Sequence, residues 1–241
     1  MTNKINIPGV NEDLAYFCGV LAGDGSINIR KNKHEYEIKC IGNPKDEVEF
    51  YHKIVSPLIK KLFDLDIIPK FHDKGTTYGV RFCSKQMVLF LIENIGLPNG
   101  KKYNKLKIPE LFLNDRKLLF SYIRGLFDTD GCVCFKKKRN LPVISISSKS
   151  SKFLKEIAEV LTNLEFTFYE VYDYKQIDIR AKKGFTLISR LELSGKSNLE
   201  LWMNTIQFFS PKHMDKINNY IENKVAGEGF EPPTFAQAFI S

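Results

Sequence analysis

Hydrophobic and polar residues in the first half of the chain switch between helical and strand spacing in a definite order. Leu14, Phe17 and Leu21 recur at helical spacing behind a possible N-cap at Asn11 or Asp13, which predicts a first helix. The elements expected after it are a hairpin over 26–30 and 35–40, a long helix opened by Pro44, a hairpin over 67–71 and 76–83, and a short helix over 85–95.

The second half repeats this order. The expected elements are a helix from Asn114 or Asp115 to Thr129, strands over 132–138 and 142–148, a helix over 150–164, strands over 166–175 and 177–193, and helices over 198–209 and 212–223. We therefore predict an α+β fold of two pseudo-symmetric αββαββα half-domains. Each four-stranded antiparallel sheet would carry helices on one face and leave the other open, and together they would form a saddle around two central packed helices.

These patterns divide the chain into half-domains over residues 1–96 and 114–224, a linker over 97–113 and a tail over 225–241. Prolines, a glycine and four lysines suggest that the linker is exposed and partly stiff. The tail contains Gly227, Gly229 and a Pro-Pro pair, so we expect it to be disordered and dispensable.

A nine-residue stretch at the end of each half's first helix occurs twice. Residues 17–25 read Phe-Cys-Gly-Val-Leu-Ala-Gly-Asp-Gly, and residues 123–131 read Ile-Arg-Gly-Leu-Phe-Asp-Thr-Asp-Gly, at a constant offset of 106 positions. Small residues recur every four positions in both copies, which places them along one ridge of a helix. Such ridges predict that the two helices pack closely against each other.

Both helices end in Asp-Gly, which is unusual for the aspartate. Glycine is an ordinary helix stop, but Asp24 and Asp130 add negative charge at the negative end of a helix dipole. Two such carboxylates at adjacent helix ends would repel each other unless a divalent cation lay between or beside them. Hard oxygen ligands suit Mg²⁺, with Mn²⁺ as a plausible substitute.

At these motif residues the sequence resembles the LAGLIDADG homing endonucleases, in the single-chain form that carries two copies of the motif. The likeness spans about residues 8–224, with Phe17 and Ile123 in place of the opening leucine and Gly23 and Thr129 in place of the alanine before the last aspartate. It implies a monomeric, intron-encoded endonuclease that hydrolyses one phosphodiester in each strand of a long, pseudo-palindromic DNA target. The motif aspartates would bind the metal ions, with the carbonyls of Gly23 and Thr129 as further ligands.

Charge and composition agree with a nucleic-acid partner inside the cell. The net charge is +8, and because Glu228 and Glu231 are the only charged residues of the tail, residues 1–224 carry +10. No apolar run is long enough to span a membrane, and the N-terminus lacks the apolar core of a signal peptide. Five cysteines without Cys-x-x-Cys spacing are expected to be reduced and mostly buried thiols.

Alternation along the strands predicts which side chains would face a DNA groove. Strands rich in Arg, Lys, Asn and Ser can read base edges in the major groove. The candidates on strands are Ser26, Asn28, Arg30, Glu35, Glu37, Lys39, Arg81, Lys136, Lys138, Lys175, Arg180 and Lys182. The candidates for phosphate contact in the linker are Lys101, Lys102, Lys105 and Lys107.

A second symmetric pair lies where the second strand of each half leads into the following helix. Lys45 and Lys149 follow their motif aspartates by 21 and 19 residues and are candidates for neutralising charge at the scissile phosphate. Asn43 and Ser147 are weaker candidates for orienting the attacking water. The four histidines have no symmetric partners or metal spacing, so we expect them at the surface.

Two other functions fit the same fold and basic surface. An intron RNA maturase would bind structured RNA; the intact Asp24 and Asp130 argue against it but leave a dual function open. A non-cutting DNA-binding regulator would be free to lose both carboxylates, which this chain retains. We do not expect an intein, because the chain starts at Met1 and no His-Asn pair closes it. The expected location is the cytoplasm or an organelle matrix, with the host genome.

Overall fold

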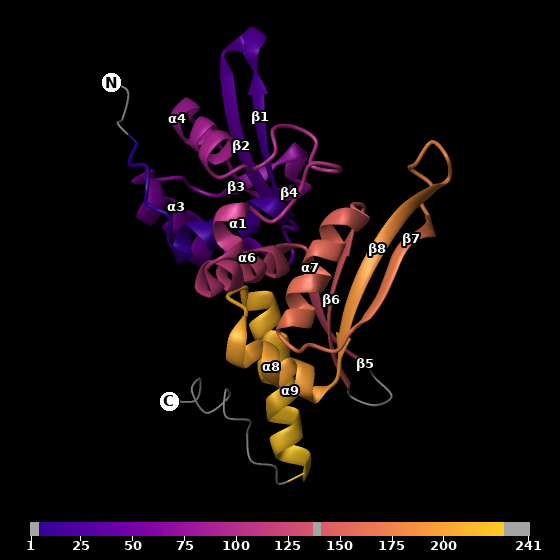
Figure 1. Cartoon of the computed structure of the whole chain (residues 1–241). Helices are drawn as coiled ribbons and strands as arrows, with labels where there is room; N and C mark the ends of the chain where they lie inside the picture. The colour runs from indigo at the N-terminus through magenta and orange to yellow at the C-terminus, as the bar shows by residue number, and fades with distance from the viewer. Residues whose placement is uncertain (1–4, 137–140, 229–241) are drawn as a thin grey trace. The chain divides into compact units, whose positions relative to one another are not determined.

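The structure is a computed structural model that describes residues 5–136 and 141–228 (Figure 1). Its contacts divide the chain into two compact units. The first contains residues 1–129 and 209–212, and the second contains residues 130–208 and 213–241. The first unit thus includes both helices that carry the repeated motif. These units therefore do not coincide with the two half-domains over residues 1–96 and 114–224.

The first unit contains a four-stranded antiparallel sheet in the order β1-β2-β4-β3, as the alternating pattern predicted. Its strands are β1 (Gly25–Arg30), β2 (Glu35–Gly42), β3 (Lys70–His72) and β4 (Thr77–Cys83). Ile27, Ile38 and Val80 are buried on one face, because apolar residues alternate with polar ones along each strand.

The helices of the first unit begin close to the predicted positions. They are α1 (Glu12–Gly23), α2 (Val48–Phe50), which continues through a π-helical turn (Tyr51–Val55) into α3 (Ser56–Phe63), α4 (Lys85–Leu89), α5 (Glu110–Leu113) and α6 (Arg116–Thr129). Asn11 caps α1 by accepting from the Leu14 amide at 2.9 Å. Pro44 does not open a helix; residues 44–46 form a turn, in which Asn43 Oδ1 accepts from the Lys45 amide, and the helix starts at Val48.

The close packing of the two motif helices is confirmed, because α1 and α6 run parallel and approach at their glycines. A Cβ on Gly19 would clash with the carbonyl of Tyr122 and lie 2.9 Å from the amide nitrogen of Leu126. A Cβ on Gly125 would clash in the same way with the carbonyl of Tyr16. Only glycine allows backbones this close, and the parallel direction places the C-terminal ends of both helices at the same end of the pair.

The second unit contains a sheet of the same topology, in the order β5-β6-β8-β7. Its elements are β5 (Gly131–Lys136), β6 (Leu141–Ser148), α7 (Ser151–Asn163), β7 (Tyr169–Ile177), β8 (Phe185–Ser194), α8 (Lys196–Thr205) and α9 (Pro211–Glu228), whose first two residues cluster with the first unit. Helices α7 and α8 pack on β6 and β8 (Figure 1). The predicted fold of two αββαββα halves is therefore confirmed.

Several local predictions were wrong. The return strand of the last hairpin starts at Phe185 and not at Ile177, because Asp178 accepts from the Arg180 amide and holds residues 178–184 in a turn. Three of the five cysteines are exposed, since Cys83, Cys132 and Cys134 alternate onto the polar strand faces. His213 is buried against the aromatic ring of Phe208 and does not lie at the surface.

The linker and the tail also differ from expectation. Leu97, Leu106 and Ile108 are buried, and the Gly100 amide donates to the Ile27 carbonyl at 2.7 Å, so the linker packs along the edge of β1 and is not fully exposed. Helix α9 continues to Glu228, and residues 229–241 of the tail lie outside the described residues. Among the described helices, none is long and apolar enough to cross a membrane.

Candidate active site

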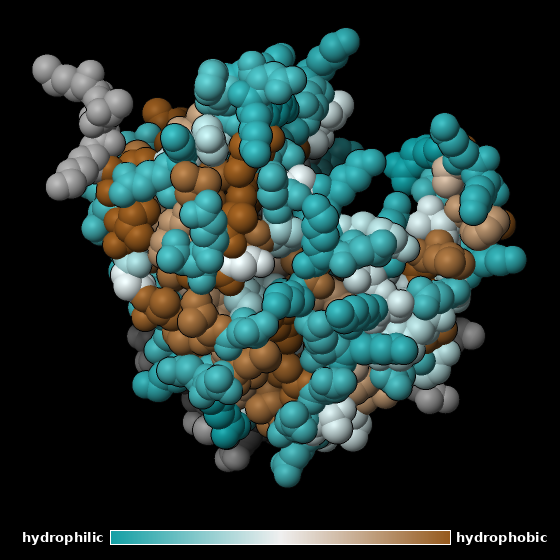
Figure 2. Space-filling view, turned by 45° about the horizontal axis from the view of Figure 1, so that its top comes forward, coloured by the Kyte–Doolittle hydropathy of each residue, from teal (hydrophilic) through white to brown (hydrophobic). Residues whose placement is uncertain are grey.

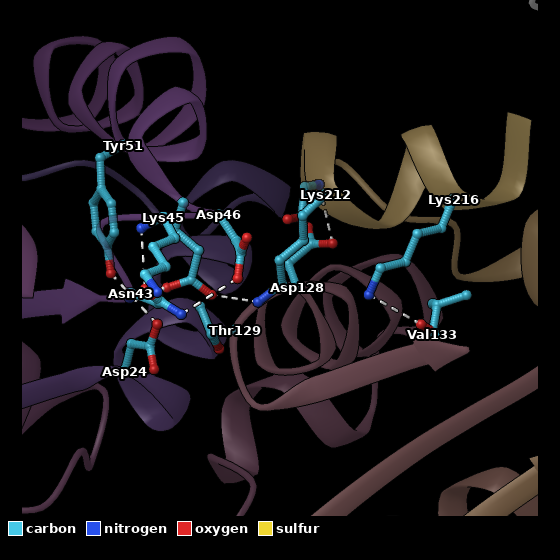
Figure 3. Close-up of polar contacts among 12 residues, drawn as sticks. Asp24, Asn43, Lys45, Asp46, Tyr51, Asp128, Thr129, Val133, Lys212 and Lys216 are labelled. Atoms are coloured by element: carbon cyan, nitrogen blue, oxygen red, sulfur yellow. Dashed lines mark hydrogen bonds and ion pairs between the residues drawn. The ribbon is translucent and has the colours of Figure 1, made fainter. Parts of the chain in front are cut away.

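Asp24 occupies the C-cap of α1, immediately before β1. Its amide donates to the Val20 carbonyl at 3.1 Å, which closes the helix, and its side chain is half-buried. The Tyr51 hydroxyl points at the carboxylate (Figure 3) and donates to Oδ2 at 3.4 Å. Burial raises the pKa of Tyr51 above its ordinary value, so this phenol remains a neutral donor that orients Asp24.

Lys102 supplies a positive charge at the same helix end. Its ammonium donates to the carbonyls of Leu21 at 3.4 Å and Ala22 at 2.8 Å, and also to that of Gly23. This contact neutralises the negative end of α1 beside Asp24. Lys102, which was expected to contact a phosphate, thus contacts the end of α1 in the structure. The Gly23 carbonyl, which was expected to bind a metal ion, accepts a hydrogen bond from Lys102.

Glu47 is a second carboxylate close to Asp24, and it was not among the residues predicted from the sequence. Its side chain is buried, with 6% exposure, and it accepts from the Asn43 amide at 2.6 Å and from Lys212. A Cβ on Gly42 would clash with Glu47 Oε2 and lie 3.0 Å from Asp24 Oδ2. The carboxylates of Asp24 and Glu47 therefore lie close together, with Glu47 already ion-paired to Lys212.

Lys45 and Lys149 lie at equivalent points of the two halves, as the sequence placed them. Lys45 is exposed in the turn between β2 and α2, and Lys149 is exposed in the bend between β6 and α7. Asn43 Nδ2 donates to Asp46 at 3.3 Å, and Ser147 is exposed near the end of β6. Their proposed roles at the phosphate remain predictions.

The second motif copy presents Asp130 at the surface, directly after α6. The Thr129 hydroxyl is turned back onto its own helix, where it donates to the carbonyls of Gly125 at 3.1 Å and Leu126 at 3.0 Å. On α9 the ammonium of Lys216 donates to the Val133 carbonyl of β5 at 3.2 Å (Figure 3). Asp130 is thus exposed, whereas Asp24 is half-buried, although their positions in the motif are the same.

Asp128, two residues before Asp130, is buried and structural. It accepts from the Tyr16 hydroxyl at 2.6 Å and from the amides of Phe209 at 3.1 Å and Ser210 at 3.1 Å. Burial raises the pKa of Asp128 to about 6, and the hydrogen bonds oppose this shift. Asp128 therefore ties α1 and residues 209–210 to α6. The sequence reading did not consider it, because the corresponding residue of the first copy is Ala22.

The register of the first sheet places its predicted DNA-facing residues on one face. Three of the six cross-strand pairs between β1 and β2 lie on this polar face, and Lys39 of β2 lies opposite Arg81 of β4. The polar-face pairs between β1 and β2 are Ser26 with Lys39, Asn28 with Glu37, and Arg30 with Glu35. Glu37 is only 3% exposed and binds both Arg30, at 3.7 Å, and Arg81. Hydrophilic side chains cover the end of this hairpin (Figure 2).

The polar face of the second sheet carries only some of the residues that were predicted to lie there. Lys136 binds Glu192 at 2.6 Å, and Arg190 binds the same carboxylate at 3.5 Å; the sequence reading missed both β8 residues. Lys175 pairs with Leu187, on the face that carries buried Leu191, so it lies on the opposite side of the sheet from Lys136. Arg180 and Lys182 lie in the turn between the strands and not on a strand, and Lys138 lies outside the described residues.

The remaining linker lysines are exposed. Lys105 donates to the Asn99 carbonyl at 3.5 Å, Lys107 binds Glu110 at 2.8 Å, and Lys101 has an exposed side chain. An exposed ion pair such as that of Lys107 contributes little to stability. Contact of these lysines with phosphates stays a prediction.

Comparison with known proteins agrees with this fold. Residues 117–206 match the family model of the LAGLIDADG-like domain. The homing endonuclease I-DmoI, in a study of its mesophilic variants, is 19% identical with a TM-score of 0.58 over 84% of this chain and 97% of that chain. I-WcaI bound to its DNA recognition sequence is 12% identical with a TM-score of 0.54 over 87% and 88%. The chain thus has the fold of the single-chain LAGLIDADG homing endonucleases, with a LAGLIDADG-like domain in its second half.

Curated relatives contain a segment similar to this chain within longer proteins. An uncharacterized protein of Methanocaldococcus jannaschii is 29% identical over 186 residues, which are 76% of this chain and 65% of that protein. A probable translation initiation factor IF-2 of the same organism is 27% identical over 218 residues, 89% of this chain but 16% of that protein. The chain therefore spans less than two thirds of the length of these relatives.

Proposed function

We propose that this protein is a site-specific endonuclease that cuts both strands of duplex DNA with the help of divalent metal ions. The observation that carries the proposal is the pair of parallel helices α1 and α6, packed at Gly19 and Gly125, each followed by an aspartate. The shared fold supports the DNA substrate, since structures of I-DmoI with DNA and calcium, and of I-WcaI with its recognition sequence, describe such complexes.

Asp24 and Asp130 would hold the metal ions, with Glu47 close to Asp24 and the Thr129 carbonyl as a further oxygen ligand. A bound ion would polarise the scissile phosphate and lower the pKa of a coordinated water. Mg²⁺ is the ion we propose, with Mn²⁺ as a substitute; structures of I-DmoI have been determined with each. The Gly23 carbonyl could join this ligand set only after Lys102 moves away from it.

The chain's own side chains would position the reacting groups. The Tyr51 hydroxyl holds the Asp24 carboxylate, and Lys45 and Lys149 would neutralise negative charge on the phosphate as it is attacked. Asn43 and Ser147 would orient the attacking water. In this proposal each strand is cut once, and the protein acts as a monomer in the compartment that holds its host genome.

The polar sheet faces would read the target. Arg30, Lys39 and Arg81 offer donors from the first sheet, and Lys136 and Arg190 from the second. Because the residues on the two faces differ, the preferred site should be long and not a perfect palindrome. Exposed Lys101, Lys105 and Lys107 would add phosphate contacts that do not depend on sequence.

The test is cleavage of a pooled random-sequence DNA library in Mg²⁺ by the wild-type protein and by an Asp24→Asn, Asp130→Asn double variant. The proposal predicts that the ends of the wild-type products converge on one long motif and that the double variant makes no such products. DNA that is bound and never cut would overturn the endonuclease assignment. Structured intron RNA would then be the ligand to examine, as expected of a maturase.

A further inference from the structure

Tyr51 is a fully buried phenol that meets the candidate active site with its hydroxyl group. The residue is 0% exposed, and its hydroxyl donates to Asp24 Oδ2 at 3.4 Å (Figure 3). Another neighbour of this oxygen is Cys40 Sγ at 3.9 Å, and a thiol is a weak acceptor. Because a carboxylate accepts more strongly than a thiol, the single hydroxyl proton is directed to Asp24.

The ring of Tyr51 is fixed from several sides. It meets the ring of Phe50 edge-on, with 5.6 Å between the centroids, and that of Tyr78 with 6.4 Å. A Cβ on Gly79 would lie 3.0 Å from Tyr51 Cε1, so β4 packs closely against the ring. Tyr51 also opens the π-helical turn over Tyr51–Val55, and such turns are frequent at functional sites. Because the ring cannot swing away, its hydroxyl holds Asp24 in one orientation.

The second half has an aliphatic residue at the corresponding point. The helix that follows the second strand has its N-cap at Glu47 in the first half and at Ser150 in the second. Tyr51 is the fourth residue after the first cap and Leu154 the fourth after the second, and both are 0% exposed. Leucine fills a core position as tyrosine does, but it has no proton to donate to a carboxylate. The second half therefore cannot reproduce the phenol contact at this position.

A carboxylate that binds a metal ion depends on the groups that orient it. Substituting such an outer partner typically costs about 10- to 100-fold in metal affinity or activity. At 3.4 Å the hydrogen bond from Tyr51 is long, so we expect the lower end of this range. We propose that Tyr51 is a positioning residue for the cleavage of one DNA strand alone, the strand whose scissile phosphate meets the metal ion at Asp24. This inference rests on the proposed function, in which each motif aspartate serves one strand.

The test follows the two strands of the target selected from the library separately. Each strand carries its own fluorescent label, and single-turnover cleavage in Mg²⁺ gives one rate for each strand. Asp24→Asn identifies the strand served by Asp24 as the one that it slows more. Tyr51→Phe removes only the hydroxyl, so it should slow that same strand about tenfold, leave the rate of the other strand unchanged, and make a nicked duplex accumulate.

The ratio of the two rates separates positioning from stability, because a loss of folded protein would slow both strands by the same factor. Tyr78→Phe is the matched control. It removes the hydroxyl of the adjacent ring, which donates to the Pro69 carbonyl at 3.2 Å, and it should leave the ratio unchanged.

A second measurement does not depend on cleavage. A target with methylene phosphonates, which cannot be hydrolysed, in place of both scissile phosphates is bound to the protein and titrated with Mn²⁺. Electron paramagnetic resonance should show that one Mn²⁺ ion binds about tenfold more weakly in Tyr51→Phe than in the wild type, while Tyr78→Phe binds it as the wild type does.

Two results would overturn the inference and leave the endonuclease assignment intact. One is that Tyr51→Phe slows both strands by the same factor, and the other is that it slows neither strand. A library from which the wild-type protein cuts no DNA would overturn the proposed function and this inference together.

Discussion

The ammonium of Lys102 donates a hydrogen bond of 2.8 Å to the carbonyl oxygen of Ala22, 80 residues earlier in the chain. This contact places a cation at the C-terminal end of α1, beside the carboxylate of Asp24, and joins the linker to the motif helix. The linker thus contributes to the architecture of the candidate active site.

Replacing Lys102 with methionine should lower the free energy of unfolding by about 1–2 kcal/mol, because the last carbonyls of α1 lose their charged donor. Urea denaturation followed by circular dichroism measures this. Lys101→Met removes the same charge from an exposed neighbour and should change stability by less than about 0.5 kcal/mol. Equal effects of the two substitutions would show that the contact with α1 contributes nothing.

Gly19→Ala should destabilise the protein by about 3 kcal/mol, since the added Cβ would meet backbone atoms of Tyr122 and Leu126 that cannot move without separating α1 from α6. Gly9→Ala is the matched control, because a Cβ there has no neighbour within 4 Å. Thermal unfolding of both variants measures the difference. If Gly19→Ala unfolds at the wild-type temperature, the close packing of the motif helices is wrong.

The buried Asp128 makes stability depend on pH. Its pKa is about 6 in the folded protein against an ordinary value of 3.8, so between these values the folded state binds more protons than the unfolded state. Stability should therefore fall as pH rises from about 4 to 6, by about 3 kcal/mol from this group, and this contribution should stay constant above that range. Urea unfolding at several pH values should show this slope in the wild type and lose it in Asp128→Asn; an unchanged slope in the variant would assign it to other groups.

Glu37 should control DNA specificity through the two arginines that it binds. Glu37→Gln removes the carboxylate that fixes Arg30 and Arg81 on the sheet face, so non-specific DNA should bind more tightly while the preference for the selected target falls about tenfold. The Kd values for target and scrambled duplexes at one salt concentration give this ratio. Glu49→Gln makes the same charge change on an exposed helix residue and should leave the ratio unaltered.

Much of this fold could be predicted from sequence because its determinants are local and repeated. Alternation placed Ser26, Asn28 and Arg30 on one strand face, and small residues at a spacing of four placed Gly19 at a helix contact; the structure contains both features. The 106-residue offset gave the two motif copies before any packing was known.

What the sequence could not reveal depends on contacts between distant residues that have no counterpart in the other half. Lys102 reaches α1 from the linker, and Lys212 reaches Glu47 across 165 positions, so no spacing rule identifies either one. The start of β8 was misplaced because Asp178 holds a turn through bonds to the Arg180 amide and Thr186, in a segment that reads as alternating.

The central claim is that Asp24 acts in cleavage and not in DNA binding, and single-turnover cleavage of the selected target tests it most directly. Asp24→Asn should bind the target with a Kd within about threefold of wild type in EDTA, yet cut it about 100-fold or more slowly in Mg²⁺, a loss of roughly 3 kcal/mol of transition-state stabilisation. Asp64→Asn, an exposed control at the end of α3, should cut at the wild-type rate. Cleavage by Asp24→Asn at the wild-type rate, or cleavage by the wild type that continues in EDTA, would contradict the account.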